Sequence, residues 1–245
     1  MNVIKSDLYE LGNKMNIEKF KQLLSSMGKC EKCLNLKGSN EKDRSLINIF
    51  QNHDFCKNIP SIWTDWFNRL DSKIMIIGQD WGPYNDMKKL NELLKNDKSN
   101  WKELIEYEKS NTKKLLESYI KESSNNKYSL NDIFITNAIM CARKGNNYRG
   151  DNINLKKSTN NCSGYLLNQI DIVKPKVILT LGYYPLLSLS TLYGFNIEKN
   201  LKETIHLYPE IHIKDFVIIP LFHPVAQIKK IEQLEQYKRI WKYID

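Results

Sequence analysis

Four short, continuously apolar segments constrain the fold more than any other feature of this 245-residue chain. Polar or turn-forming residues bound each of them, and segments with helical periodicity separate them. Strands that are apolar on both faces are typical of a parallel sheet with helices on either side. The segments that we predict to be strands are residues 73–77, 132–141, 176–181 and 216–220.

Helical patterns occupy much of the sequence between these strands. Residues 16–27 place five apolar side chains on one helical stripe, and the polar stretch 37–60 and the Gly- and Asn-rich, basic stretch 143–157 are expected to be irregular. We therefore predict one α/β domain over residues 1–245, with three α/β/α layers around a mostly parallel, four-stranded sheet. Residues 1–60 would form a helical N-terminal extension. The stripe consists of Ile17, Phe20, Leu23, Leu24 and Met27, and further helices are expected over 100–123, 160–173 and 227–243.

The charge balance of the chain is strongly basic. It carries 37 Lys and Arg residues, of which five are Arg, and its formal net charge is +9. A positive balance favours a polyanionic partner, above all nucleic acid. The alternative is that A/T-rich codons, which also favour Asn and Ile, produced much of the lysine. No apolar stretch approaches the length of a membrane span, and the N-terminus lacks the apolar core of a signal peptide, so we expect a cytoplasmic protein.

Polar residues follow the predicted strands at the ends where ligands bind in open parallel sheets. The first strand ends in Gly78-Gln79-Asp80, the second carries Asn137, and the fourth runs into His223. Individually these residues have simpler explanations, since Asp80 could cap a helix, Asn137 could satisfy a backbone group, and His223 could be an ordinary loop residue. Because all three residues follow or end parallel strands, we expect them to meet at the carboxyl edge of the sheet and to line a cleft there.

Several common active-site motifs are absent from the sequence. No Gly-x-Gly-x-x-Gly or Gly-Lys-Ser/Thr segment follows a strand, so neither a dinucleotide nor a P-loop nucleotide cofactor is expected. No Gly-x-Ser-x-Gly elbow occurs, which argues against a serine hydrolase.

Four of the five cysteines form a candidate metal site. Cys30 and Cys33 are a close pair after a predicted helix, and Cys141 and Cys162 lie at a strand end and a helix start. Four thiolates can bind zinc or an iron–sulfur cluster, and spacing alone does not choose between them. Core packing is the competing use for Cys141 and Cys162, and we interpret Cys56 as a packing residue.

Taken together, these segments resemble the uracil-DNA glycosylase superfamily. Residues 78–80 are similar to its first motif, residues 222–226 to its His-Pro motif, and residues 135–141 to the segment with the uracil-reading Asn. Residues 174–182 and the Cys30–Cys33 pair resemble the iron–sulfur branch, called family 4. That branch usually has Gly-Glu-x-Pro-Gly at the first motif, whereas this chain has the Gln-Asp of the cluster-free enzymes and Trp81 in place of proline.

The resemblance implies hydrolysis of the N-glycosidic bond of uracil in DNA, with Asp80 orienting water and His223 stabilising the departing base. The base would lie against Gly78, Gln79 and Asn137, and Trp81 or Tyr84 would exclude the methyl group of thymine. Four cysteines, Cys30, Cys33, Cys141 and Cys162, would hold a structural [4Fe-4S] cluster in preference to zinc. DNA would contact Arg143, Lys144, Arg149, Lys229 and Lys230, with Gln227 or Ile228 as a wedge in the duplex.

Three alternatives differ in substrate or in class, and the absence of phosphate-binding loops disfavours one of them, a zinc-stabilised nucleotide-binding protein. A superfamily member could act on another damaged base, such as hypoxanthine or xanthine, and a protein of this fold could bind DNA without cleaving it. We expect a monomer whose partner is DNA containing uracil or another damaged base.

Overall fold

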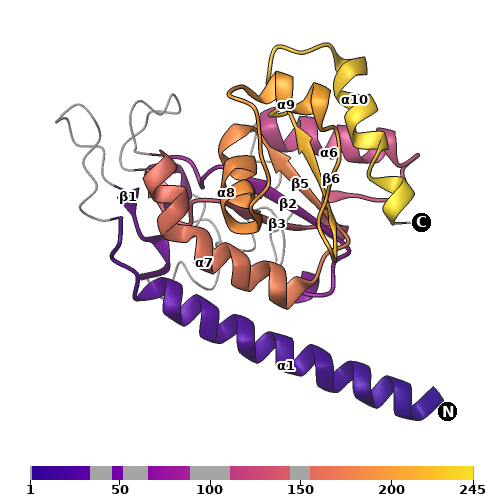
Figure 1. The fold of residues 1–245 in the computed structure, drawn as a ribbon. Coiled ribbons are helices and arrows are strands. Elements are labelled where there is room, and N and C mark those ends of the chain that lie inside the picture. Colours follow the sequence, from indigo (N-terminus) through magenta and orange to yellow (C-terminus); the bar gives the residue numbers. More distant parts are fainter. Residues whose placement is uncertain (1, 34–45, 52–65, 89–110, 144–154, 245) are drawn as a thin grey trace.

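A computed structural model describes residues 2–33, 46–51, 66–88, 111–143 and 155–244 (Figure 1). A five-stranded sheet forms its centre, in the order β3-β2-β5-β7-β6. The first four are parallel, and the short β6 pairs antiparallel with β7 at the edge. The strands are β2 (Ile74–Gly78), β3 (Phe134–Asn137), β5 (Val177–Leu181), β6 (Ile211–His212) and β7 (Val217–Leu221).

The α/β class and the four parallel strands are confirmed, and the strand count is corrected from four to five. Residues 211–212 escaped prediction because a two-residue edge strand has no measurable periodicity. A separate two-stranded antiparallel sheet joins β1 (Leu46–Ile47) to β4 (Ala142–Arg143). The predicted strand 132–141 is therefore too long, because the chain leaves the main sheet after Asn137 and Arg143 enters β4.

Helices cover both faces of the main sheet (Figure 1). Alternate side chains of β2 divide between two cores, with Met75 and Ile77 on one face and Ile74 and Ile76 on the other. The first core is closed by α1 (Asn2–Gly28), α7 (Leu155–Val173) and α8 (Tyr183–Tyr193), and the second by α6 (Asn111–Ser123) and α10 (Lys230–Lys238). The three-layer arrangement follows directly from strands that are apolar on both faces.

The predicted N-terminal stripe lies against the first core. Phe20, Leu23, Leu24 and Met27 are buried, and Ile17 is partly buried. Phe20 meets the rings of Trp66 and Phe134 edge to face, with centroids 5.4 and 5.9 Å apart. These contacts attach α1 to the segment that precedes β2 and to the first residue of β3.

The other helices depart from the predicted bounds at their ends. α7 begins at Leu155 instead of residue 160, and α10 ends at Lys238, with a 3-10 turn (Trp241–Tyr243) after it. α8 and α9 (Leu201–Leu207) were not predicted. Residues 100–110 of one predicted helix and most of the 37–60 connection lie outside the described residues, as does Cys56.

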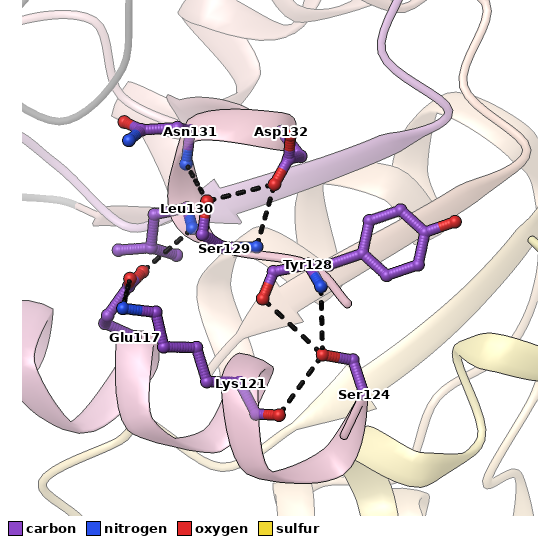
Figure 2. Close-up of polar contacts among 8 residues, drawn as sticks. All are labelled: Glu117, Lys121, Ser124, Tyr128, Ser129, Leu130, Asn131 and Asp132. Atoms are coloured by element: carbon purple, nitrogen blue, oxygen red, sulfur yellow. Dashed lines mark hydrogen bonds and ion pairs between the residues drawn. The ribbon is translucent and has the colours of Figure 1, made fainter. Parts of the chain in front are cut away.

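Polar contacts fix the connection from α6 to β3 (Figure 2). The backbone N–H of Ser129 donates to Asp132 Oδ2 at 2.8 Å, and the Ser129 hydroxyl accepts from the N–H of Asn131 at 3.3 Å. Glu117 of α6 accepts from the N–H of Leu130 at 2.8 Å and pairs with Lys121. This capping box stabilises the turn that leads into β3.

No helix within the described ranges is both long and apolar enough to cross a bilayer.

Candidate active site

The carboxyl edge of the sheet gathers the polar residues that follow its parallel strands. Gly78 at the end of β2 pairs with Asn137 at the end of β3. β5 lies between β2 and β7, and β7 ends two residues before His223. Gly182, with a φ of +99°, turns the chain sharply from β5 into α8 at the same edge. The strand order thus brings the three predicted segments to one rim.

Asn137 lies directly against the backbone of Gly78. A Cβ atom at position 78 would be 2.4 Å from Asn137 Oδ1, which is closer than carbon and oxygen can approach. Past the two strands, the N–H groups of Ala138 and Ile139 donate to the carbonyls of Gly78 and Gln79 at 2.8 and 2.9 Å. Only glycine at position 78 leaves the carboxamide of Asn137 in this position.

Three hydrogen bonds hold the carboxylate of Asp80. Its Oδ1 accepts from the backbone N–H of Gly82 at 2.7 Å and from Arg143 Nε at 3.1 Å. Its Oδ2 accepts from Gln79 Nε2 at 2.9 Å. The Asp80 side chain is only 3% exposed, so solvent screens these bonds weakly. The carboxylate therefore has a fixed orientation.

His223 lies within electrostatic range of Asp80. Its side chain stays exposed, but neighbouring protein atoms desolvate the ring enough to lower its pKa below the ordinary 6.5. The negative charge of Asp80 acts in the opposite direction and raises that pKa, which places the two side chains within electrostatic range. A pKa below 6.5 favours the neutral imidazole at pH 7.

Trp81 and Tyr84, the two side chains predicted to exclude the methyl group of thymine, have different contacts. The indole of Trp81 donates to the carbonyl of Met140 at 3.1 Å, and its ring lies 5.7 Å from that of Trp66. Tyr84 is partly buried and packs against the same apolar core. Trp81 therefore joins the exit of β2 to the segment that precedes Cys141.

The residues predicted to contact DNA are only partly described. Gln227, Lys229 and Lys230 are exposed and Ile228 is half-buried, all beyond the His-Pro segment. Lys144 and Arg149 lie outside the described residues. Arg143 is paired with Asp80, an interaction that the sequence analysis missed because nothing in the spacing of positions 80 and 143 indicates it.

Four free cysteines lie in three segments of the chain: Cys30 and Cys33 follow α1, Cys141 follows β3, and Cys162 lies in α7. Cys33 and Cys162 are hydrogen-bonded, and Cys141 is within electrostatic range of Cys30 and Cys33. The hydrogen bond from Cys162 lowers the pKa of Cys33 to about 6, whereas the same bond and burial raise the pKa of Cys162. Burial raises the pKa of Cys141 to about 12.

Hydrogen-bond donors surround these sulfur atoms. Asn161 Nδ2 lies 3.4 Å from the sulfur of Cys33, and the N–H of Met140 lies 3.4 Å from that of Cys162. Donors of this kind are typical around thiolates that bind a metal or cluster. Within the ranges that the structure describes, no three His, Cys, Asp or Glu side chains form a group that could hold a metal ion.

The fold and the carboxyl edge of the sheet define a class of protein: an α/β protein with an acid, an amide and an imidazole at the carboxyl edge of a parallel sheet. The family model of the uracil DNA glycosylase superfamily matches residues 64–245, so the chain belongs to that superfamily. The resemblance inferred from the motifs is thereby confirmed.

One curated relative indicates the branch. The chain is 32% identical over 117 residues to a protein named type-4 uracil-DNA glycosylase from Sulfurisphaera tokodaii. The matched region is 44% of this chain and 49% of the relative, so the chain spans about half the length of that protein. This match supports the family 4-like affinity.

Proposed function

We propose that this protein is a DNA glycosylase that hydrolyses the N-glycosidic bond of uracil in DNA, releasing the free base and leaving an abasic site. One observation carries the proposal: in a member of this superfamily, Asp80 and His223 lie within electrostatic range of each other at the edge that also holds Asn137. Extruding the base from the duplex costs a few kcal/mol, which contacts with the DNA must offset.

Asn137 would recognise the extruded base. A carboxamide offers one acceptor and two donors, which match the N3–H and a carbonyl on the Watson–Crick edge of uracil. The contact with Gly78 supports this role, because it fixes where the carboxamide can lie. Trp81 or Tyr84, which both pack against the first apolar core, would exclude the methyl group of thymine.

Asp80 would hold the attacking water. Each carboxylate oxygen can accept about two hydrogen bonds. Oδ1 already accepts two, from Gly82 and Arg143, whereas Oδ2 accepts one, from Gln79. Oδ2 is therefore the atom that we assign to the water. The same negative charge would stabilise positive charge that develops on the sugar as the bond breaks.

His223 would stabilise the departing base. Negative charge develops on a carbonyl oxygen of the leaving uracil, and a fixed N–H donor aimed at that oxygen lowers the barrier. The lowered pKa of His223 supports a neutral donor. A neutral ring also avoids the direct ion pair with Asp80 that a protonated imidazole would favour, and so leaves room for water and base.

Cys30, Cys33, Cys141 and Cys162 would hold a [4Fe-4S] cluster. Four free thiols from three parts of the chain, with N–H donors at the sulfurs of Cys33 and Cys162, support this proposal. When bound, the cluster would supply structural cross-linking rather than redox chemistry. It would join the N-terminal segment to the strand that carries Asn137. Iron and acid-labile sulfide analysis tests the assignment, and stoichiometric zinc without iron would refute it.

A panel of oligonucleotides with single lesions tests the proposed substrate. Uracil, hypoxanthine and xanthine would each be placed opposite a natural base and in single strands, and the released base identified by mass spectrometry. The proposal expects uracil release to be fastest. Faster release of hypoxanthine or xanthine would show that a purine, and not uracil, is the preferred substrate. DNA binding without release of any base would favour the non-catalytic alternative.

A further inference from the structure

The pairing of Arg143 with Asp80 gives this arginine a function other than the phosphate contact expected from the sequence. Arg143 Nε lies 3.1 Å from Asp80 Oδ1, and the two side chains are only 14% and 3% exposed. Exposed lysines and arginines contact phosphates by reaching into solvent, whereas this guanidinium is directed inward. A shielded pair is also strongly interdependent, since removing one partner leaves a buried charge uncompensated.

The backbone of Arg143 is held as firmly as its side chain. Its N–H donates to the carbonyl of Gly82 at 2.9 Å, and it bridges to Pro83 and pairs with Leu46 of β1. Gly82 in turn donates its N–H to Asp80 Oδ1 at 2.7 Å. Asp80, Gly82 and Arg143 thus form a closed ring of three hydrogen bonds. Two of its three donors, the N–H of Gly82 and Nε of Arg143, point at the same oxygen, Asp80 Oδ1.

We infer that Arg143 is a positioning residue that occupies Asp80 Oδ1, so that Oδ2 faces the reacting water. This inference rests on the proposed function, because it gives Arg143 a role in the hydrolysis. Without Arg143, the carboxylate would keep only the bonds from Gly82 and Gln79, so its orientation, and with it the acceptor for the water, would be less strictly fixed. Misplacement by about 1 Å can cost roughly 100-fold in rate.

Steady-state and single-turnover kinetics on uracil-containing DNA separate positioning from phosphate binding. Arg143→Ala is expected to lower kcat about 100-fold with little change in KM. Arg143→Lys, which keeps the charge, is expected to recover part of the loss. Lys229→Ala serves as the phosphate-contact comparison and should raise KM and reduce the salt dependence. Arg69→Ala removes an arginine before β2 begins and should change neither constant. If Arg143→Ala raises KM and leaves kcat unchanged, the inference is wrong.

A double-mutant cycle with Asp80→Asn provides the second test. If Arg143 acts through Asp80, adding Arg143→Ala to Asp80→Asn should cost less than about threefold in kcat, and independent effects would refute the inference. Urea unfolding of the same four proteins measures the coupling without activity. If the wild-type protein releases no base, the proposed function is wrong. The unfolding data still test the Arg143–Asp80 pair in that case, because additive losses of unfolding free energy in the two single variants would show that these side chains do not interact.

Discussion

Substituting Gly78 tests the geometry of the base site at one atom. The Cβ of Gly78→Ala would lie 2.4 Å from Asn137 Oδ1, whereas ordinary van der Waals contact begins near 3.4 Å. The carboxamide must therefore move by about 1 Å, a displacement that costs on the order of 100-fold when it separates a binding group from its substrate. We expect kcat/KM for uracil release to fall by about that factor.

The same chain offers a matched control. Gly164 lies in α7, is exposed, and an added Cβ would have no atom within 4 Å. Gly164→Ala should leave kcat/KM unchanged and stabilise the fold by about 0.5–1 kcal/mol, because alanine favours a helix more than glycine does. Wild-type activity of folded Gly78→Ala, verified by thermal unfolding, would refute the proposed position of Asn137.

Three further outcomes follow from the same structure. An NMR titration should give His223 a pKa below 6.5. Asp80→Asn should lower this pKa further, because it removes the carboxylate that raises it, whereas Asp171→Asn should leave it unchanged. A higher His223 pKa in Asp80→Asn would contradict the proximity of the two side chains. Ser129→Ala should cost about 1 kcal/mol of unfolding free energy through the lost cap, without changing kcat, as urea unfolding would measure. Cys162→Ser should lose bound iron. Its unfolding free energy should fall by about 3 kcal/mol, the stabilisation expected from a ligand present at roughly 100 times its dissociation constant. Iron retained at the wild-type level would exclude Cys162 as a ligand.

Hydrophobic patterning predicted the parts of the fold that are set by local chemistry. The strand at 74–78 is buried on both faces, and this makes it recognisable as a short apolar run that ends in polar residues. The parallel arrangement then brings Asp80, Asn137 and His223 to one edge without any knowledge of contacts.

Other features depend on pairings distant in sequence. The two-residue strands β4 and β6 exist only because partners are present, so no local pattern indicates them. The bond between Arg143 and Asp80 joins positions 63 residues apart, and the basic stretch around Arg143 favoured an exposed loop. The direction of the Trp81 indole likewise depends on the carbonyl of Met140, which the sequence of the first motif does not reveal.

Asp80 and His223 are proposed to perform base release, and single-turnover assays of their variants test these roles most directly. Wild type, Asp80→Asn, His223→Ala and the distant control Asp171→Asn would be compared on uracil-containing DNA, with thermal unfolding verifying that each is folded. We predict that the first two variants lose roughly 10²–10⁴-fold in the rate of uracil release and that the control equals wild type. Equal rates for all four proteins would contradict the proposed active site.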